Sequence, residues 1–89
     1  MSNKSLTFVS VIRDTRNIPI REGDYVTVVQ TICASVERNT THIVFSITPD
    51  CFYLETYIIG MGLVAICLDN QLSTHFKVER LEEIELITN

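Results

Sequence analysis

Branching at Cβ is the feature that most constrains this chain. Valine, isoleucine and threonine together supply 30 of its 89 residues, whereas alanine occurs only at Ala34 and Ala65. A branched Cβ restricts side-chain rotamers in a helix but fits the pleated surface of a strand. The composition therefore predicts a mainly β fold. The short intervals between turn residues favour a small antiparallel barrel or a strongly bent sheet of five to six strands.

Apolar side chains alternate with polar ones in several short segments, which is typical of strands. The segments are residues 6–12, 25–36, 41–47, 63–68, 74–79 and 84–87. Within 41–47 the alternation places Phe45 and its apolar neighbours inward and His42 outward. Residues 63–68 are apolar on both faces, which predicts the most buried strand of the sheet.

Residues 49–59 permit two interpretations. The even positions Phe52 and Leu54 alternate with more polar neighbours and favour a strand. A helix is the alternative, because Thr48 could cap it and Gly60 could end it. The strand keeps the fold mainly β, whereas the helix would make it α+β.

Two stretches resemble parts of a known family. Residues 22–26 place Gly-Asp before a valine-rich strand, and residues 76–84 run from a strand through a charged turn to an apolar end. This order resembles the small β-barrels of the Src-homology type, in which a 3₁₀ turn precedes the closing strand. The resemblance implies a 3₁₀ turn at 80–83 and a closing strand at 84–87, but no activity. The length is that of a single domain, residues 1–89.

The apolar content exceeds what one small core can hide. Mean hydropathy is +0.23, although a domain of this size buries only about 60–65% of its unfolded surface. In a strand over 51–59, Tyr53 and Tyr57 share the outward face with Glu55 between them, and Ile59 extends that face. Tyrosine is favoured at interfaces. We therefore expect a non-catalytic interaction module that binds a second copy of itself, or another protein, through these four residues.

The alternative is a small-molecule-binding protein or an enzyme, with its pocket at a subunit interface or at the mouth of the barrel. Its candidate lining residues are Tyr25, Cys51 and His75. Cys51 is the cysteine expected to be accessible, whereas Cys33 and Cys67 lie in apolar stretches that predict buried, reduced thiols. The cysteines form no Cys-x-x-Cys pair and the histidines lack metal-ligand spacing, so we expect no metal and no cofactor.

The net charge of −4 is distributed unevenly. Residues 46–89 carry seven acidic and two basic side chains. Such a surface repels phosphate, so we expect binding neither to nucleic acid nor to anionic membranes. Residues 1–5 lack the apolar core of a signal peptide, and no apolar run reaches the roughly 18 residues of a membrane helix. A cytoplasmic protein is the resulting expectation.

Overall fold

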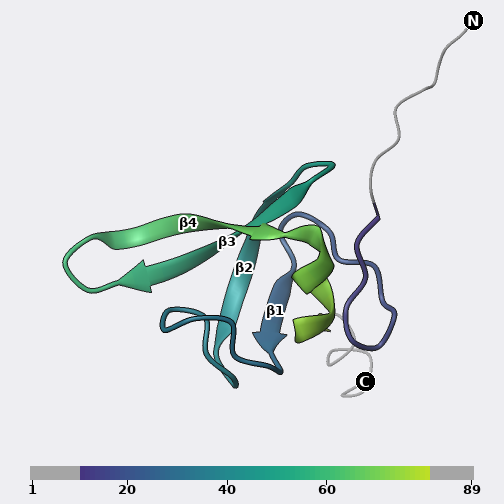
Figure 1. Cartoon of the computed structure of the whole chain (residues 1–89), viewed down its shortest axis with the longest axis horizontal. Helices are drawn as coiled ribbons and strands as arrows, with labels where there is room; N and C mark the ends of the chain where they lie inside the picture. The colour runs from purple at the N-terminus through teal and green to yellow at the C-terminus, as the bar shows by residue number, and fades with distance from the viewer. Residues whose placement is uncertain (1–10, 81–89) are drawn as a thin grey trace, which may run out of the picture.

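Five antiparallel strands form the framework of residues 11–80, the part of the chain that the computed structural model describes (Figure 1). The elements are β1 (Tyr25–Val28), β2 (Thr41–Ile47), β3 (Cys51–Ile58), β4 (Gly62–Asp69), the 3₁₀ helix η1 (Asn70–His75) and β5 (Phe76–Glu79). The mainly β fold is therefore confirmed. The alternative of a helix over residues 49–59 is wrong, because β3 occupies most of that range.

The turn before β3 explains why this segment is extended. The Thr48 hydroxyl accepts hydrogen bonds from the backbone N–H groups of Asp50 (3.4 Å) and Cys51 (3.0 Å). The Thr48 N–H itself donates to the Cys51 carbonyl at 2.8 Å. Thr48 therefore closes a tight turn instead of capping a helix. The aromatic and β-branched side chains that follow favour the strand.

The strands form one sheet in the order β4-β3-β2-β1-β5. The sheet does not close into a barrel, because β4 and β5 lie at its two edges and are not paired with each other. The 3₁₀ helix η1 at residues 70–75 directly precedes the last described strand. The turn expected over 80–83 lies, except for Arg80, outside the described residues. The strand expected over 84–87, and most of the one expected over 6–12, lie outside the described residues.

The core contains buried side chains from every strand. Phe52 of β3 and Phe76 of β5 meet edge to face, with ring centroids 5.6 Å apart and an interplanar angle of 85°. Such pairs add to the stabilisation that burial of the two rings provides. The buried apolar residues are Ile12, Ile20, Val26, Val28, Val36, Val44, Phe52, Leu54, Leu68, Phe76 and Val78.

The strand expected over 25–36 is much shorter. β1 ends at Val28, whose N–H donates to the Thr40 carbonyl and whose carbonyl accepts from the Asn39 N–H. Asn39 adopts a φ of 74°, a left-handed conformation that asparagine tolerates better than most residues. Residues 29–40 therefore form a loop between β1 and β2 rather than a continuation of the strand.

In β2 the expected orientation is reversed at His42 and Phe45, whereas Ile47 packs against the core as expected. His42 is buried and Phe45 is 58% exposed. The pairing of β2 with β3 shifts register between Val44 and Ser46, which places Phe45 at an irregularity of the strand. Alternation predicts orientation only along a regular strand, so the irregularity accounts for the wrong prediction at Phe45.

The position of β4 also differs from the prediction. Residues 63–68 were expected to form the most buried strand, but β4 lies at an edge of the sheet, and Leu63 is 67% exposed. Leu68 is buried and Ile66 packs against the core. The second apolar face of this strand is therefore turned away from the interior, and its hydrophobic side chains remain uncovered.

Asp14 attaches the segment before β1 to β5. Its side chain is fully buried, and its carboxylate accepts hydrogen bonds from the backbone N–H groups of Arg16 (2.8 Å), Ile18 (2.8 Å) and Val78 (2.9 Å). Burial raises the pKa of Asp14, but the N–H groups of Val78, Ile18 and Arg16 together lower it more, helped by the Arg16 guanidinium. The net pKa lies below the ordinary value, so the folded protein holds this carboxylate ionised.

Candidate interaction surface

One side of the β3–β4 hairpin is turned away from the core. In β3, Tyr53, Glu55 and Tyr57 alternate with buried side chains. The register pairs Tyr53 with Cys67, Glu55 with Ala65 and Tyr57 with Leu63. Directly opposed residues of paired strands share a face. The outer face, as we define it, consists of Tyr53, Glu55, Tyr57, Leu63, Ala65 and Cys67.

Most of the large exposed apolar side chains among residues 11–80 lie on the outer face or near it. Tyr57 is 68% exposed and Leu63 is 67% exposed. At the hairpin tip, Ile59 is 91% exposed and Met61 is 70% exposed, and β2 contributes the exposed Phe45. Apolar side chains gathered in this way are typical of surfaces that bind another protein.

The turn at the tip holds Ile59 and Met61 away from the sheet. Gly60 and Gly62 take φ values of 89° and 86°, which glycine adopts without steric cost. The Met61 N–H donates to the Ile58 carbonyl at 2.9 Å. Figure 1 shows the resulting hairpin as an arm that projects from the rest of the sheet. The two apolar tip residues are therefore presented to solvent at the end of that arm.

The two edges of the sheet differ in how their backbone groups are satisfied. At the β5 edge, the Thr15 N–H donates to the Phe76 carbonyl at 2.9 Å and the Arg16 guanidinium donates to the Val78 carbonyl. The Asp14 carboxylate accepts from the Val78 N–H. Within residues 11–80, no such hydrogen bond reaches the outward edge of residues 63–68 in β4. We call β4 the open edge.

The open edge also lacks the residues that usually protect exposed strands. β4 contains no proline, lysine or arginine, and its charged residue, Asp69, lies at its last position. Lysine and proline are common at natural edges because they oppose pairing with another chain. An eight-residue apolar strand without them favours the addition of a further strand.

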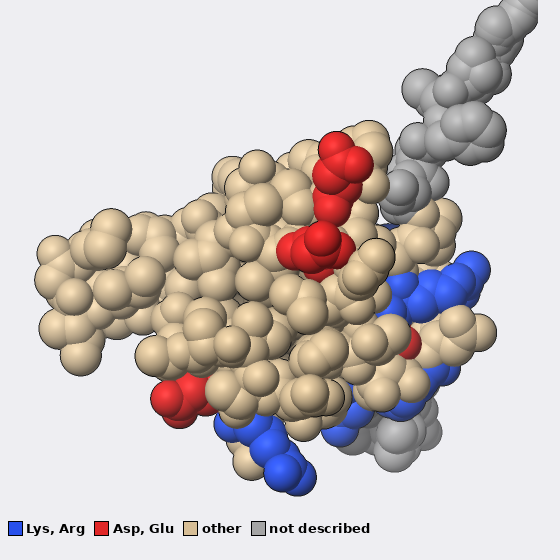
Figure 2. Space-filling view, in the orientation of Figure 1, with Lys and Arg blue, Asp and Glu red and all other residues tan. Residues whose placement is uncertain are grey.

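Positive charge is missing from this half of the molecule. Residues 39–76 contain no lysine or arginine. In Figure 2 the arm at the left shows no lysine or arginine on the visible face, and these side chains lie along the lower side and at the right of the molecule. Glu55 is the charged residue of the outer face. The surface therefore suits an apolar partner better than a polyanion.

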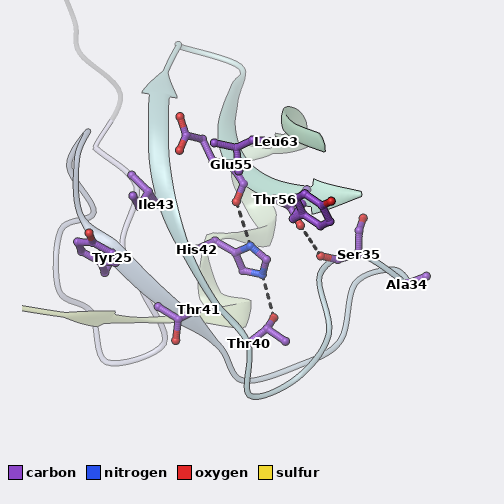
Figure 3. A pocket seen from close by; sticks show the side chains of 11 residues that line it. Tyr25, Ala34, Ser35, Thr40, Thr41, His42, Ile43, Glu55, Thr56 and Leu63 are labelled. Atoms are coloured by element: carbon purple, nitrogen blue, oxygen red, sulfur yellow. Dashed lines mark hydrogen bonds between the residues drawn. The ribbon is translucent and has the colours of Figure 1, made fainter. Parts of the chain in front are cut away.

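A groove of about 630 Å³ opens where β2 and β3 separate. Thr41–Ile43 of β2 pair with β1, whereas Glu55–Ile58 of β3 pair with β4, so the two strands diverge. His42 bridges the gap (Figure 3): its Nδ1 lies 3.0 Å from the Glu55 carbonyl oxygen and its Nε2 lies 2.8 Å from the Thr40 hydroxyl. A carbonyl oxygen only accepts, so Nδ1 is the donor of that bond.

Substitution of His42 tests this bridge. We expect His42→Leu to lower the free energy of unfolding by about 1–3 kcal/mol, because the Glu55 carbonyl loses its side-chain donor. His42→Gln, whose amide can still donate, should retain part of that stability. Urea denaturation of the three proteins measures the difference. Equal stability of His42→Leu and the unsubstituted chain would show that the bridge contributes nothing.

The three residues expected to line a ligand pocket are not brought together. Tyr25 lines the groove beside His42. Cys51 lies at the start of β3 against Thr48, with 3.4 Å between its Sγ and the Thr48 Oγ1. His75 ends η1, and its buried Nδ1 has no hydrogen-bond partner among residues 11–80. Neither Cys51 nor His75 is among the residues that line the groove.

The cysteines are more accessible than their apolar neighbours predict. Cys33 and Cys67 are exposed, and Cys51 is partly exposed, so the expectation of buried thiols at 33 and 67 is wrong. Cys67 is exposed because β4 is an edge strand whose second face is uncovered. Cys33 lies in the loop between β1 and β2, beside the Ser35 hydroxyl.

Sequence reasoning identified one strand of the outer face and missed the other. Tyr53, Glu55 and Tyr57 follow from the alternation in β3. Leu63 and Met61 were missed, although Gly60 and Gly62 on either side of Met61 are typical of a hairpin tip. A hairpin at that point would have placed Leu63 opposite Tyr57 and indicated the shared face.

Residues 11–80 contain no helix that is long and apolar enough to cross a membrane. In the same range, no three His, Cys, Asp or Glu side chains gather into a group that could hold a metal ion. Comparison of the chain with known protein families, with curated proteins and with solved structures finds no match.

Proposed function

We propose that this chain is a non-catalytic interaction module that self-associates through the outer face and the open edge of its β3–β4 hairpin. The observation that carries the proposal is that both features lie on the same arm. Leu63 and Tyr57 are exposed on the outer face, and beside them no hydrogen bond from within residues 11–80 reaches the outward backbone groups of residues 63–68 in β4. Either feature alone is common, but together they provide backbone hydrogen bonds and apolar burial for one partner.

A second copy of the chain satisfies both requirements. Two β4 strands placed antiparallel about a two-fold axis would pair their outward N–H and C=O groups. The two outer faces would then continue across the joint on one side of a common sheet. No lysine or arginine lies in either hairpin to oppose this arrangement. Tyr57 and Ile59, which we expected at the interface from sequence, are the exposed members, while Tyr53 and Glu55 are partly buried.

A charge introduced on the outer face tests the proposal. At micromolar concentration the unsubstituted chain should sediment as a species larger than its 10.1 kDa monomer. Leu63→Lys should weaken self-association on the order of a hundredfold, about 2.7 kcal/mol, because each association would place two charged lysines where it now has two leucines. Sedimentation velocity over a concentration series measures the change.

Val11→Lys is the matched control. Val11 is 61% exposed, close to the value for Leu63, but belongs to the segment before β1. This variant should therefore associate as the unsubstituted chain does. A purely monomeric unsubstituted chain, or equal weakening by both variants, would contradict the proposal.

Fewer observations support the alternative of a small-molecule-binding protein or enzyme with a ligand pocket. The groove has a volume within the range of ligand sites, and Tyr25 lines it. Its central polar group, His42, already uses both ring nitrogens in contacts within the protein. A ligand would therefore have to displace those contacts, so we retain self-association as the proposed function.

A further inference from the structure

Cys67 of the outer face has a second cysteine, Cys51, as a neighbour on the adjacent strand. Cys51 is paired with Asp69 and Tyr53 with Cys67, so Cys51 and Cys67 are diagonal neighbours on adjacent strands. Diagonal neighbours have Cα atoms about 7–8 Å apart, and a disulfide needs about 7 Å or less. Both thiols are accessible, Cys67 more so than Cys51. A small approach of the strands would bring the sulfur atoms within bonding distance.

The surroundings make the two thiols unequal. A hydrogen bond from Cys67 lowers the pKa of the Cys51 thiol, and the hydroxyls of Thr48 and Tyr53 act in the same direction. The bond to Cys51 raises the pKa of Cys67, and bonds to the two thiols raise the pKa of Tyr53. Cys51 is therefore the thiol that ionises first, while Cys67 keeps its proton. In thiol–disulfide exchange the thiol that ionises first attacks the oxidant, and the second thiol, called the resolving thiol, then closes the disulfide.

We propose that Cys51 and Cys67 are a redox-reactive dithiol that a low-molecular-weight disulfide such as oxidised glutathione closes into a cross-strand disulfide. The Cys51 thiolate attacks one sulfur of the oxidant, forms a mixed disulfide and releases one glutathione thiolate. Cys67 then loses its proton and attacks the Sγ of Cys51, which expels the second glutathione. Two protein thiols are oxidised, and one glutathione disulfide is reduced to two glutathione thiols.

Cys33 provides an internal control. It is exposed, and the hydrogen bond with the Ser35 hydroxyl lowers the pKa of its thiol. Its side chain contacts that hydroxyl, with 3.5 Å between Sγ and Oγ, and not a second thiol. Cys33 should therefore react with the same oxidant but stop at the mixed disulfide.

The test uses the full chain, excess oxidised glutathione, acid quenching and intact mass spectrometry. The expected product carries one glutathione, on Cys33, and has lost the two hydrogens of the other thiols. Trypsin separates Cys33 from the pair, because no lysine or arginine lies between Arg38 and Lys77. Cleavage after Glu55 then separates Cys51 from Cys67 only if the disulfide is absent or has been reduced.

Two variants assign the roles of the thiols. In Cys67→Ser the glutathione adduct should remain on Cys51, because no thiol resolves it. In Cys51→Ser an adduct formed on Cys67 should likewise persist, because no second thiol then lies beside it to resolve the mixed disulfide. Adducts on all three cysteines of the unsubstituted chain, with no bond between 51 and 67, would overturn the proposal. The disulfide forms within a single copy, and Leu63→Lys weakens self-association but keeps both thiols, so repeating the reaction with that variant separates the failure of this proposal from the failure of self-association.

Discussion

Replacement of Asp14 by alanine is expected to lower the free energy of unfolding by about 3 kcal/mol or more. Three backbone N–H groups, from Arg16, Ile18 and Val78, would lose their acceptor. The Arg16 side chain would also lose a carboxylate at 3.4 Å. The contact with Val78 spans 64 positions of sequence, so its loss detaches the segment before β1 from β5.

The effect of Asp14 should also depend on pH. A carboxyl whose pKa is lower in the folded than in the unfolded chain stabilises the fold above the unfolded value of about 3.9. That stabilisation disappears as the pH falls through the lower pKa of the folded protein. Asp14→Asn, which keeps the shape but carries no charge, should therefore lose stability at neutral pH. Its stability should fall less steeply than that of the unsubstituted chain as the pH is lowered below about 5.

Urea denaturation at several pH values measures both quantities. Asp50→Asn is the control, because Asp50 is exposed at the turn before β3. The control should remain within about 0.5 kcal/mol of the unsubstituted protein. If Asp14→Asn showed the same acid dependence as the unsubstituted chain, the role assigned to this carboxylate would be wrong.

Phe52→Ala is expected to lower the free energy of unfolding by about 3–5 kcal/mol. The ring of Phe52 is fully buried and meets Phe76 of β5 edge to face. Its loss leaves a cavity that the surrounding strands can fill only in part. The contact joins β3 to β5, which β2 and β1 separate in the sheet order, so the cavity weakens packing between strands that are not hydrogen-bonded to each other.

Phe45→Ala is the matched control, since it removes the same side chain from a position that is 58% exposed. Its cost should be less than about 1 kcal/mol. Chemical denaturation of the two variants under the same conditions compares them directly. Similar losses of stability would mean that Phe45 is packed in the core, as alternation in residues 41–47 predicted and contrary to its exposure in the structure.

The fold was predictable where alternation is regular. Phe52 and Leu54 point inward and Tyr53 and Tyr57 outward, as a simple strand over 51–59 requires. The prediction failed at Phe45, where the pairing of β2 shifts register. Periodicity carries no information about such a shift, because it depends on the partner strand.

Other features depend on contacts between distant residues. Residues 63–68 are apolar on both faces. This pattern is the same for a central strand and for an edge strand with one face exposed to solvent, so the sequence does not show which of the two forms. Asp14 lies in a polar stretch of sequence, and its role becomes visible only when Val78 is beside it. The pair formed by Cys51 and Cys67 likewise follows from the β3–β4 register and not from the spacing of the cysteines.

The difference between the two edges limits how far this chain can grow by strand addition. A sheet with two available edges can recruit copies at both sides, and repetition of that step produces a fibre. Here Asp14, Thr15 and Arg16 form hydrogen bonds with the backbone of β5, whereas no residue from 11 to 80 does so at the outward edge of residues 63–68 in β4. Polymerisation by this route would therefore stop at two copies, and loss of the β5 cover in Asp14→Ala would open a path to aggregation.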